Sequence, residues 1–237
     1  MPKTILFTFA HPDDESFTCG GTLVELSKQK DTKTVLYSAT AGDAGKCGEP
    51  PICTREDLAS VRRNELTEAA THLGIDDLII DDYQDGKLSE LSPNTLKNRL
   101  IELIDHIKPD AVVTFPPHGL SGHSDHTAIQ EATLQAIQEQ PNSVKELYYA
   151  TFPQSLATET GNPAFADPDE NITLIKSFTG EHMKTVQRAL LAHKTQHLSV
   201  ERVFPTIHHN SGFSKFGNKE YFIKAWDSGS NQNSILL

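Results

Sequence analysis

The sequence is short of several residue types, and each shortage excludes a class of protein. Only three cysteines occur among 237 residues, an odd number without a disulfide framework, and no apolar run approaches the length that crosses a bilayer. The N-terminus lacks the long apolar stretch and cleavage site of a signal peptide. Lysine and arginine total 21 against 32 acidic residues, a formal net charge of −11, and form no basic stripe for nucleic acid. We therefore expect a cytoplasmic protein without a membrane or nucleic-acid partner.

The few cysteines are expected to be reduced thiols, which is usual for a cytoplasmic protein. Cys47 and Cys53 share a loop rich in glycine and proline, whereas Cys19 stands apart from them. A local disulfide or a metal contact is therefore an alternative for the Cys47 and Cys53 pair.

Strand-like and helix-like segments alternate along the chain. Short apolar segments predict strands over residues 4–10, 34–39, 78–80, 111–115 and 146–152. Amphipathic or capped segments predict helices over residues 17–28, 54–73, 93–107, 127–138 and 181–197, with a long surface excursion over 154–171. This alternation predicts an α/β fold with a mostly parallel sheet covered by helices on both faces. We expect one domain over residues 1–226, followed by a polar, frayed tail over 227–237.

Local signals predict where two of these helices begin or end. Thr54 and Asp57 have the spacing of a capping box, and Gly74 is expected to stop the same helix. Ser92 and Pro93 are a good N-cap and first-turn pair for the next helix.

A cluster of chemically active side chains follows the first predicted strand. His11, Asp13, Asp14 and Glu15 place four groups able to bind metal or move protons within five residues, directly after the apolar segment 4–10. In an open α/β sheet, ligands bind at the carboxyl ends of the strands. Taken alone, these acids also fit the ordinary acidic first turn of a helix.

A second cluster, His123, Asp125 and His126, follows the apolar segment 111–115. Each histidine alone is better explained as a loop or solvent-facing residue, but two such clusters at two strand ends indicate the halves of one metal site. Catalytic zinc takes three protein ligands and leaves one position open. His11, one aspartate of the first cluster and one histidine of the second complete such a set, which also suits Fe²⁺.

The side chains left over suit the chemistry around that metal. With Asp14 as the ligand, Asp13 is free to act as a base, because a metal lowers the pKa of its bound water toward about 7. The remaining histidine of the second cluster can donate to a developing oxyanion. Asp125 can hold an imidazole in one tautomer.

Several motifs carry a family resemblance. In chain order they are AHPDDE at 10–15, CGGT at 19–22, RRNEL at 62–66, DG at 85–86, GHSDH at 122–126 and AHKTQ at 192–196. The set resembles the LmbE-like (PIG-L) N-acetylglucosaminyl deacetylases, whose nearer members include the deacetylases of bacillithiol biosynthesis. Ser124 stands where the family usually has proline, and Thr195 stands where it usually has serine.

The resemblance implies a Rossmann-like, LmbE-like fold and a zinc-dependent hydrolase. Such an enzyme removes the acetyl group from an N-acetylglucosamine-type small molecule, such as GlcNAc-malate, by attack of zinc-bound water. It implies that His11, Asp14 and His126 hold the zinc and that Asp13 is the general base. Relatives are often trimers or hexamers, so a homo-oligomer is also implied.

The resemblance assigns further roles around the metal. His123 would stabilise the oxyanion, oriented by Asp125. Arg62 and Asp85 would hold sugar hydroxyls or a substituent. On the residues alone, Arg62 also fits a solvated helix position paired weakly with Glu65, and Asp85 fits a common Asp-Gly turn.

Three other residues are expected near this site. We expect Glu15 to be a hydrogen-bond partner behind the site and His193 to lie at its rim. We expect His118 to be an ordinary loop histidine, with a place at the mouth of the site as the alternative.

Two other functions fit the same residues. One is an amidase acting on thiol conjugates or other non-sugar amides. The other is a non-catalytic sugar- or metal-binding module. The presence of both Asp13 and His123 disfavours the module, because binding alone requires neither group.

Overall fold

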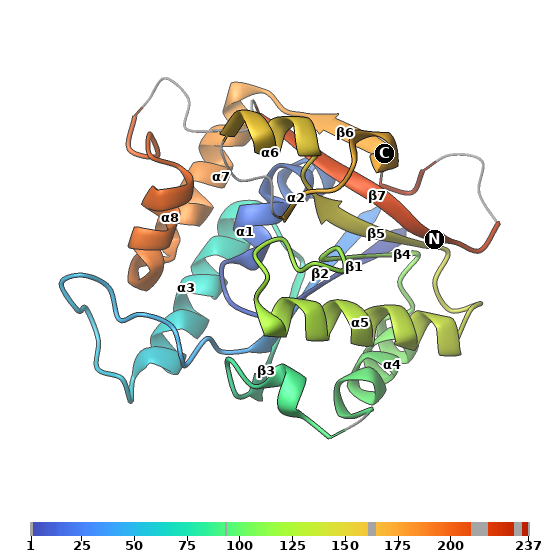
Figure 1. The fold of residues 1–237 in the computed structure, drawn as a ribbon, viewed down its shortest axis with the longest axis horizontal. Coiled ribbons are helices and arrows are strands. Elements are labelled where there is room, and N and C mark those ends of the chain that lie inside the picture. Colours follow the sequence, from blue (N-terminus) through green and yellow to red (C-terminus); the bar gives the residue numbers. More distant parts are fainter. Residues whose placement is uncertain (1, 93, 161–164, 210–217, 230–233, 237) are drawn as a thin grey trace.

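A seven-stranded sheet with the order β3-β2-β1-β4-β5-β7-β6 forms the centre of the molecule (Figure 1). The computed structural model describes residues 2–92, 94–160, 165–209, 218–229 and 234–236. The strands are β1 (Lys3–Phe9), β2 (Thr32–Thr40), β3 (Asp77–Tyr83), β4 (Ala111–Thr114), β5 (Glu146–Thr151), β6 (Leu174–Ser177) and β7 (Lys219–Asp227).

Strands β1 to β5 are parallel, and β7 runs antiparallel to both of its neighbours. The prediction of a mostly parallel α/β sheet is therefore confirmed. Strands β6 and β7 were not predicted. Charged residues interrupt both segments, among them Lys176, Glu220 and Lys224, so neither segment reads as an apolar run.

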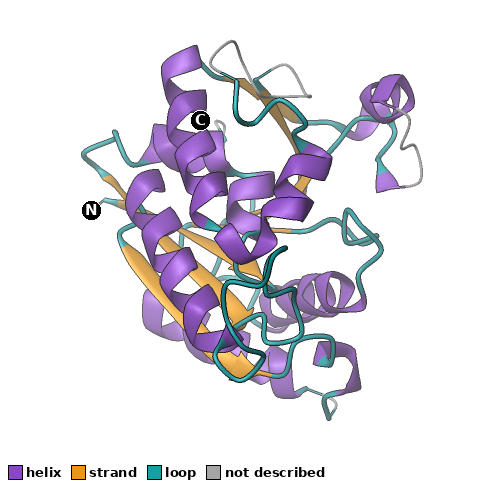
Figure 2. Ribbon diagram, turned by 90° about the vertical axis from the view of Figure 1, so that its left-hand side faces the viewer, coloured by secondary structure: helices purple, strands orange, loops and turns teal. Residues whose placement is uncertain are grey.

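Helices cover both faces of the sheet (Figures 1 and 2). The helices are α1 (Asp14–Thr18), α2 (Gly20–Leu26), α3 (Leu58–Leu73), α4 (Thr95–Ile107), α5 (Ser124–Glu139), α6 (Gln154–Thr160), α7 (Gly180–Ala192) and α8 (His197–Val203). Short 3₁₀ helices span Leu88–Glu90, Asp169–Asn171 and Lys194–Gln196. Helix α4 packs against α5 on one side, and α2 and α3 pack against α7 on the other. In the described parts of the chain, no helix is long and apolar enough to span a membrane.

The core consists of the central strands and the inner faces of these helices. Ile5, Leu6 and Phe7 of β1 are fully buried, as are Val112 and Val113 of β4. Both sides of these strands are apolar because helices cover both faces of a parallel sheet. This explains why the strands read in the sequence as continuous apolar runs and not as alternating patterns.

Two of the predicted helices are broken in the structure. The segment 17–28 divides into α1 and α2 at Cys19, whose backbone leaves the helical region with φ −134°. The segment 181–197 divides into α7, a 3₁₀ turn and α8 at His193, which has ψ 62°. Helical periodicity continued through both breaks, so it did not reveal them.

The local signals for α3 are confirmed. The hydroxyl of Thr54 donates to Asp57 Oδ2 at 2.8 Å, and the Asp57 N–H donates to Thr54 Oγ1 at 3.2 Å, although the helix itself begins at Leu58. Gly74 ends the helix in the left-handed conformation with φ 75°. The N-cap of α4 is Asn94 and not the predicted Ser92, and the predicted Pro93 lies outside the described residues.

The end of the chain differs from the frayed tail that we expected. Leu236 is fully buried, and its carbonyl accepts a hydrogen bond from Lys176 Nζ at 2.6 Å. The Ile235 N–H donates to Glu146 Oε2 at 2.7 Å. These contacts attach residues 235–236 to β5 and β6. The expected excursion over 154–171 contains α6 and a 3₁₀ turn.

Candidate active site and metal centre

The two clusters meet where the order of the strands reverses. Strand β1 pairs with β2 on one side and with β4 on the other, so the chain leaves β1 and β4 at adjacent positions of the same edge. The first cluster occupies the turn after β1 and the start of α1, and the second occupies the start of α5 after β4. Ligands of open α/β sheets bind at such a point. The predicted meeting of the two clusters is confirmed.

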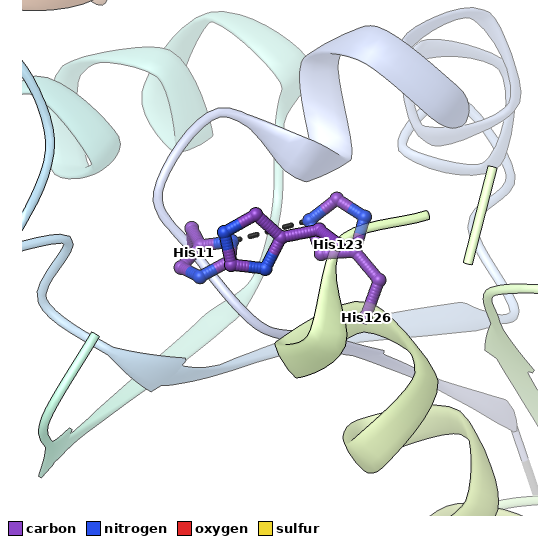
Figure 3. Close-up of side chains that lie close together, drawn as sticks. All are labelled: His11, His123 and His126. Atoms are coloured by element: carbon purple, nitrogen blue, oxygen red, sulfur yellow. Dashed lines mark hydrogen bonds between the residues drawn. The ribbon is translucent and has the colours of Figure 1, made fainter. Parts of the chain in front are cut away.

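Atoms of His11, Asp14 and His126 face one another closely. His11 Nδ1 lies 3.2 Å from His126 Nε2, and His126 Nε2 lies 3.3 Å from Asp14 Oδ1. The remaining pair, His11 Nδ1 and Asp14 Oδ2, is separated by 3.6 Å. Figure 3 shows the two imidazoles pointing toward each other, with His123 beside them.

In each imidazole, the nitrogen that faces away from the other ring carries the proton, so the inner nitrogen, which faces the other ring, is unprotonated when the ring is neutral. His11 Nε2 lies 3.0 Å from Asp85 Oδ1 and 3.2 Å from Asp125 Oδ2, so its proton is donated to carboxylates. His126 Nδ1 lies 2.9 Å from the Gly119 carbonyl, to which it donates. In the neutral rings, both inner nitrogens then carry lone pairs, and the Asp14 carboxylate adds a third donor. Three lone pairs at such distances fit a divalent cation.

The charges around these three residues favour the ionised form of Asp14 and the protonated form of His11. Burial opposes the charged form of His11, yet the carboxylates of Asp125, Asp14 and Asp85 raise its pKa well above the usual value. Burial alone would raise the pKa of Asp14, but His126 and His11 hold it well below its usual range. The site therefore retains an ionised carboxylate and attracts a positive charge, either protons on the imidazoles or a metal ion.

Two other trios bring their ligand atoms close together: His11 with His123 and His126, and His11 with Asp85 and Asp125. In the second trio, the Asp125 carboxylate already accepts the Gly86 N–H at 2.7 Å and the Leu88 N–H at 3.1 Å. An ion there would replace the hydrogen bonds that set the His11 tautomer. An ion on the inner face of His11, toward Asp14 and His126, would displace none of these hydrogen bonds.

Asp125 has a different partner from the one that we expected. Its carboxylate bonds to His11 and to the backbone after β3, and its backbone N–H donates to His123 Nδ1 at 3.2 Å. This happens because His123 is the N-cap of α5, so its ring faces the N–H groups of the first turn. The Asp125 side chain therefore orients His11. The His123 ring is held through its Nδ1 by a backbone N–H, so its Nε2 takes no part in this hydrogen bond.

Asp13 is held in an unusual backbone conformation next to the candidate metal centre. It is the N-cap of α1 with φ 113°, a left-handed conformation that non-glycine residues rarely adopt. Its N–H donates to Glu15 Oε2 at 3.1 Å, and Arg62 Nη2 donates to Asp13 Oδ2 at 3.1 Å and to the Pro12 carbonyl. Such strain persists only where the surroundings enforce it, and it concentrates at functional sites.

The environment of Asp13 suits a group that takes up protons near neutrality. Burial raises the pKa of Asp13 to about 6, although the Arg62 guanidinium acts in the opposite direction. Arg62 is 3% exposed on α3, so the solvated helix position and the weak surface pair with Glu65 are both wrong. The Glu65 carboxylate instead accepts the N–H and the hydroxyl of Thr195, at 2.8 and 2.7 Å.

Glu15 and His193 form a buried pair behind Asp13. His193 Nε2 lies 3.0 Å from Glu15 Oε1, which also accepts the Ser16 hydroxyl at 2.5 Å. Glu15 therefore has the supporting role that we expected. His193 is fully buried and not at the rim, because the chain turns inward where α7 ends.

Asp85 is largely occupied by other protein groups. Besides His11, its carboxylate accepts the Ala44 N–H at 3.1 Å and lies 4.0 Å from Arg62 Nη1.

His118 lies in the loop before α5, where its Nε2 is 3.1 Å from Asp167 Oδ2. Cys47 and Cys53 are free thiols next to each other, and Cys19 is a buried free thiol.

A cavity of about 810 Å³ opens over these groups. The predicted residues that line it are His11, Asp13, Asp14, Arg62, Asp85, His123 and His126. Sequence reasoning missed the aromatic and C-terminal parts of the wall, which include Phe17, Phe152, Phe165, Gln196, Ser199 and Arg202. The spacing of 196, 199 and 202 on one helical face was the available signal, but the predicted helix ended at residue 197, where α8 begins.

The chain is similar to several known deacetylases. The "Probable N-acetyl-alpha-D-glucosaminyl L-malate deacetylase 2" of Bacillus anthracis is 31% identical over 196 residues, which are 82% of this chain and 81% of that protein. The 1D-myo-inositol 2-acetamido-2-deoxy-alpha-D-glucopyranoside deacetylase of Acidothermus cellulolyticus is 27% identical, covering 100% of this chain and 95% of that protein. The solved structure of N,N′-diacetylchitobiose deacetylase from Pyrococcus horikoshii has a TM-score of 0.64 at 20% identity, covering 94% of this chain and 84% of that one, and so shows the same fold.

The PIG-L family, described as GlcNAc-PI de-N-acetylase, matches residues 6–137, a stretch that contains both clusters. Because this match spans more than half of the chain and the Bacillus anthracis relative matches most of it, the chain belongs to the PIG-L family.

Proposed function

We propose that this protein is a metal-dependent deacetylase that hydrolyses the acetyl amide of an N-acetylglucosamine-type substrate. The observation that carries the proposal is the convergence of His11 Nδ1, His126 Nε2 and the Asp14 carboxylate, with the separate carboxylate of Asp13 in the wall of the same cavity. The two relatives named above differ in what the sugar is attached to, but N-acetylglucosamine is common to both names. We therefore assign that sugar to the catalytic end of the cavity.

We assign His11, Asp14 and His126 as the ligands of one divalent cation. Two imidazoles and a carboxylate suit Zn²⁺, and they also suit Fe²⁺. When bound, the cation would supply Lewis acidity, which polarises the acetyl carbonyl and makes a water molecule more acidic. Asp125 and Asp85 keep His11 in the tautomer that presents Nδ1 to the cation.

Asp13 would act as the general base and later as the acid. Its pKa of about 6 allows the carboxylate to take a proton from the attacking water near neutral pH. Arg62 holds one carboxylate oxygen, Oδ2, and so fixes the direction of the other. The proton that Asp13 gains can then pass to the amine nitrogen as the bond to the acetyl group breaks, which yields acetate and a free amine.

His123 would stabilise the negative charge that develops on the acetyl oxygen. Its Nδ1 accepts the backbone N–H of Asp125, so in the neutral ring the proton resides on Nε2 and is available for donation. Partial burial and the nearby His11 and His126 lower the pKa of His123, which keeps the ring neutral at pH 7. Arg62 and Asp85 line the cavity beside these groups, and we propose that they position the sugar.

The experiment is a screen for acetate and primary amine release from N-acetylglucosamine glycosides, with Zn²⁺ or Fe²⁺ added and with a chelator. We expect equal amounts of acetate and amine, abolished by the chelator and restored by metal. Amine release from thiol conjugates but not from sugars would instead identify an amidase of another substrate class. Sugar binding without any release, in metal-loaded protein, would identify a non-catalytic module. Either result contradicts the proposal.

A further inference from the structure

The turn between α7 and α8 makes hydrogen bonds to three separate parts of the active site. Each of its buried polar side chains reaches a different element: His193 reaches the start of α1, Thr195 reaches α3, and Gln196 reaches the loop after β2. None of these side chains has a role in the proposed chemistry. Through them, a distant segment of the sequence is attached to the elements that carry Asp13 and Arg62.

One chain of hydrogen bonds leads from His193 to the backbone of Asp13. His193 Nε2 lies 3.0 Å from Glu15 Oε1, and the other carboxylate oxygen, Oε2, accepts the Asp13 N–H at 3.1 Å. Glu15 is 1% exposed, and His193 is fully buried. A buried carboxylate depends on its protein partners, because no water replaces a partner that is lost. The imidazole therefore fixes the orientation in which Glu15 presents Oε2 to Asp13.

The backbone of Asp13 requires a fixed acceptor of this kind. With φ 113°, this residue has a conformation that non-glycine residues rarely adopt, so the surroundings must enforce it. Glu15 holds its N–H, whereas Arg62 holds the Pro12 carbonyl and one oxygen of the Asp13 carboxylate. The direction of the other carboxylate oxygen depends on both sets of contacts.

The same turn also supports Arg62. The Glu65 carboxylate, three residues along α3 from Arg62, accepts the N–H and the hydroxyl of Thr195. The Gln196 amide donates to the Lys46 carbonyl at 2.8 Å, in the loop that also supplies a carbonyl acceptor to Arg62. Both supports of the proposed base therefore lead back to one short segment of the chain.

The stability of the fold does not explain a histidine at position 193. Its Nδ1 is buried and, among the residues that the structure describes, has no hydrogen-bond partner. An unsatisfied buried nitrogen lowers stability, whereas an apolar side chain of similar size would leave no such atom. In that part of the chain, the ring's one hydrogen bond is the contact with Glu15.

We propose that His193 is a positioning residue for the hydrolytic reaction and acts through Glu15 on the backbone and carboxylate of Asp13. This rests on the proposed function, in which Asp13 moves the proton, and adds a residue that lies outside the cavity wall. Loss of the imidazole should then lower kcat, whereas KM and metal affinity should change little, because the proposed sugar and metal contacts are intact.

The test compares His193→Leu with His193→Gln in metal-loaded protein, by acetate release from the N-acetylglucosamine glycoside that the wild type hydrolyses fastest. Leucine has no donor for Glu15, whereas the glutamine amide can donate from a position close to that of Nε2. For His193→Leu, we expect kcat to fall about 10- to 100-fold, because a shift of roughly 1 Å in a reacting group can cost that much, with KM and the dissociation constant of Zn²⁺ within about threefold of the wild type. His193→Gln should recover most of the loss. His193→Asn, whose amide is too short to reach Glu15, replaces the leucine variant if the latter does not fold.

A double substitution distinguishes positioning of Asp13 from a general structural effect. In an Asp13→Asn background, His193→Leu should lower the residual activity by less than about threefold, because the group that His193 positions is already lost. His208→Gln is the matched control, since His208 Nε2 also lies 3.1 Å from a glutamate oxygen, that of Glu201, but outside the cavity wall. It should leave kcat unchanged.

Hydrogen exchange of the Asp13 amide, followed by NMR, keeps the two proposals apart because it does not depend on activity. The Asp13 N–H should exchange faster in His193→Leu than in the wild type and at the wild-type rate in His193→Gln. If the metal-loaded wild type releases no acetate from any glycoside, the proposed function fails, and the exchange rates still decide whether His193 holds Asp13. An unchanged exchange rate in His193→Leu, a wild-type kcat in that variant, or a kcat loss that persists in the Asp13→Asn background would overturn the positioning role.

Discussion

At the scale of single residues, most of the unusual geometry surrounds Asp13. Its left-handed backbone, its bond to Glu15 and its pair with Arg62 all act on one carboxylate in the cavity wall. A strained conformation held by several independent contacts is expected where a side chain must be aimed accurately. Asp13 is thus the residue whose replacement should separate catalysis from metal binding.

For Asp13→Asn, we expect kcat to fall about 10²- to 10⁴-fold, because the amide cannot take a proton from water. Metal affinity should stay within a few-fold of the wild type, since the proposed ligands, His11, Asp14 and His126, are unchanged. Steady-state acetate release and metal titration measure the two effects. An Asp13→Asn protein with full activity would contradict the assignment of the base.

For Asp125→Asn, we expect the affinity for Zn²⁺ to fall about 10- to 100-fold, because the carboxylate that sets the His11 tautomer is lost. Asp167→Asn is the matched control: Asp167 also accepts from a histidine, His118, but has no contact with the metal ligands. Competition with a chromogenic chelator gives both dissociation constants. Equal effects of the two substitutions would show that Asp125 does not act through His11.

The sequence predicted which residues meet, but not all of their contacts. His11, Asp14 and His126 were identifiable because acid-and-imidazole clusters followed two apolar strands. The partner of Asp125 was not, because adjacency in the sequence suggested His123, whereas the fold brings His11 from another strand to its carboxylate. Only a tertiary structure reveals such a contact.

At the scale of elements, the loop between β2 and α3 sets the position of Arg62. Gly42 has φ +68°, and its carbonyl accepts from Arg62 Nη1 at 3.0 Å. A Cβ at Gly42 would lie 2.1 Å from the same nitrogen, so any other residue must displace the guanidinium. The glycine therefore serves the active site as well as the turn.

We expect Gly42→Ala to lower kcat/KM by about 10- to 100-fold, because a shift of roughly 1 Å in a positioning group can cost that much. Gly229→Ala is the control: Gly229 also has positive φ, at +76°, but nothing lies within 4 Å of an added Cβ. Both variants should lose about 1 kcal/mol or more of stability from backbone strain, measured by urea unfolding. Activity that is equally retained in both would exclude this role of Gly42.

The parallel strands were predictable as elements, whereas the breaks in helices were not. Apolar runs identified β1 and β4 because both faces of the sheet are covered. Gly20 and Gly21 allow close packing of α2: a Cβ at Gly20 would lie 2.7 Å from Val186, and one at Gly21 would lie 2.5 Å from Phe178. The break at Cys19 lies directly before these two glycines, and nothing in the local periodicity signals it.

At the scale of the whole molecule, the site links the N-terminal and C-terminal parts of the chain. Glu15 contacts His193, and Glu65 contacts Thr195, so the start of α1 and α3 both bond to the segment between α7 and α8. The homo-oligomer that the family resemblance implies stays a prediction, which sedimentation of the purified protein would test.

We expect metal binding to stabilise the whole fold, because the proposed ligands come from the turn between β1 and α1 and from α5. A ligand at 100 times its dissociation constant stabilises the native state by about 2.7 kcal/mol. Zn²⁺ should therefore raise the Tm of metal-free protein by a few degrees, measured by differential scanning calorimetry. His126→Gln should lose this increase, and His208→Gln, which replaces an exposed histidine paired with Glu201, should retain it.

The most direct measurement is the metal content of the purified protein, by inductively coupled plasma mass spectrometry, alongside acetate release from GlcNAc-malate. We expect one divalent metal per wild-type chain, and we expect His126→Gln to lose the metal and the activity together while His208→Gln keeps both. A wild-type protein that releases acetate without bound metal, or a His126→Gln protein that retains a full equivalent, would contradict a metal centre formed by His11, Asp14 and His126.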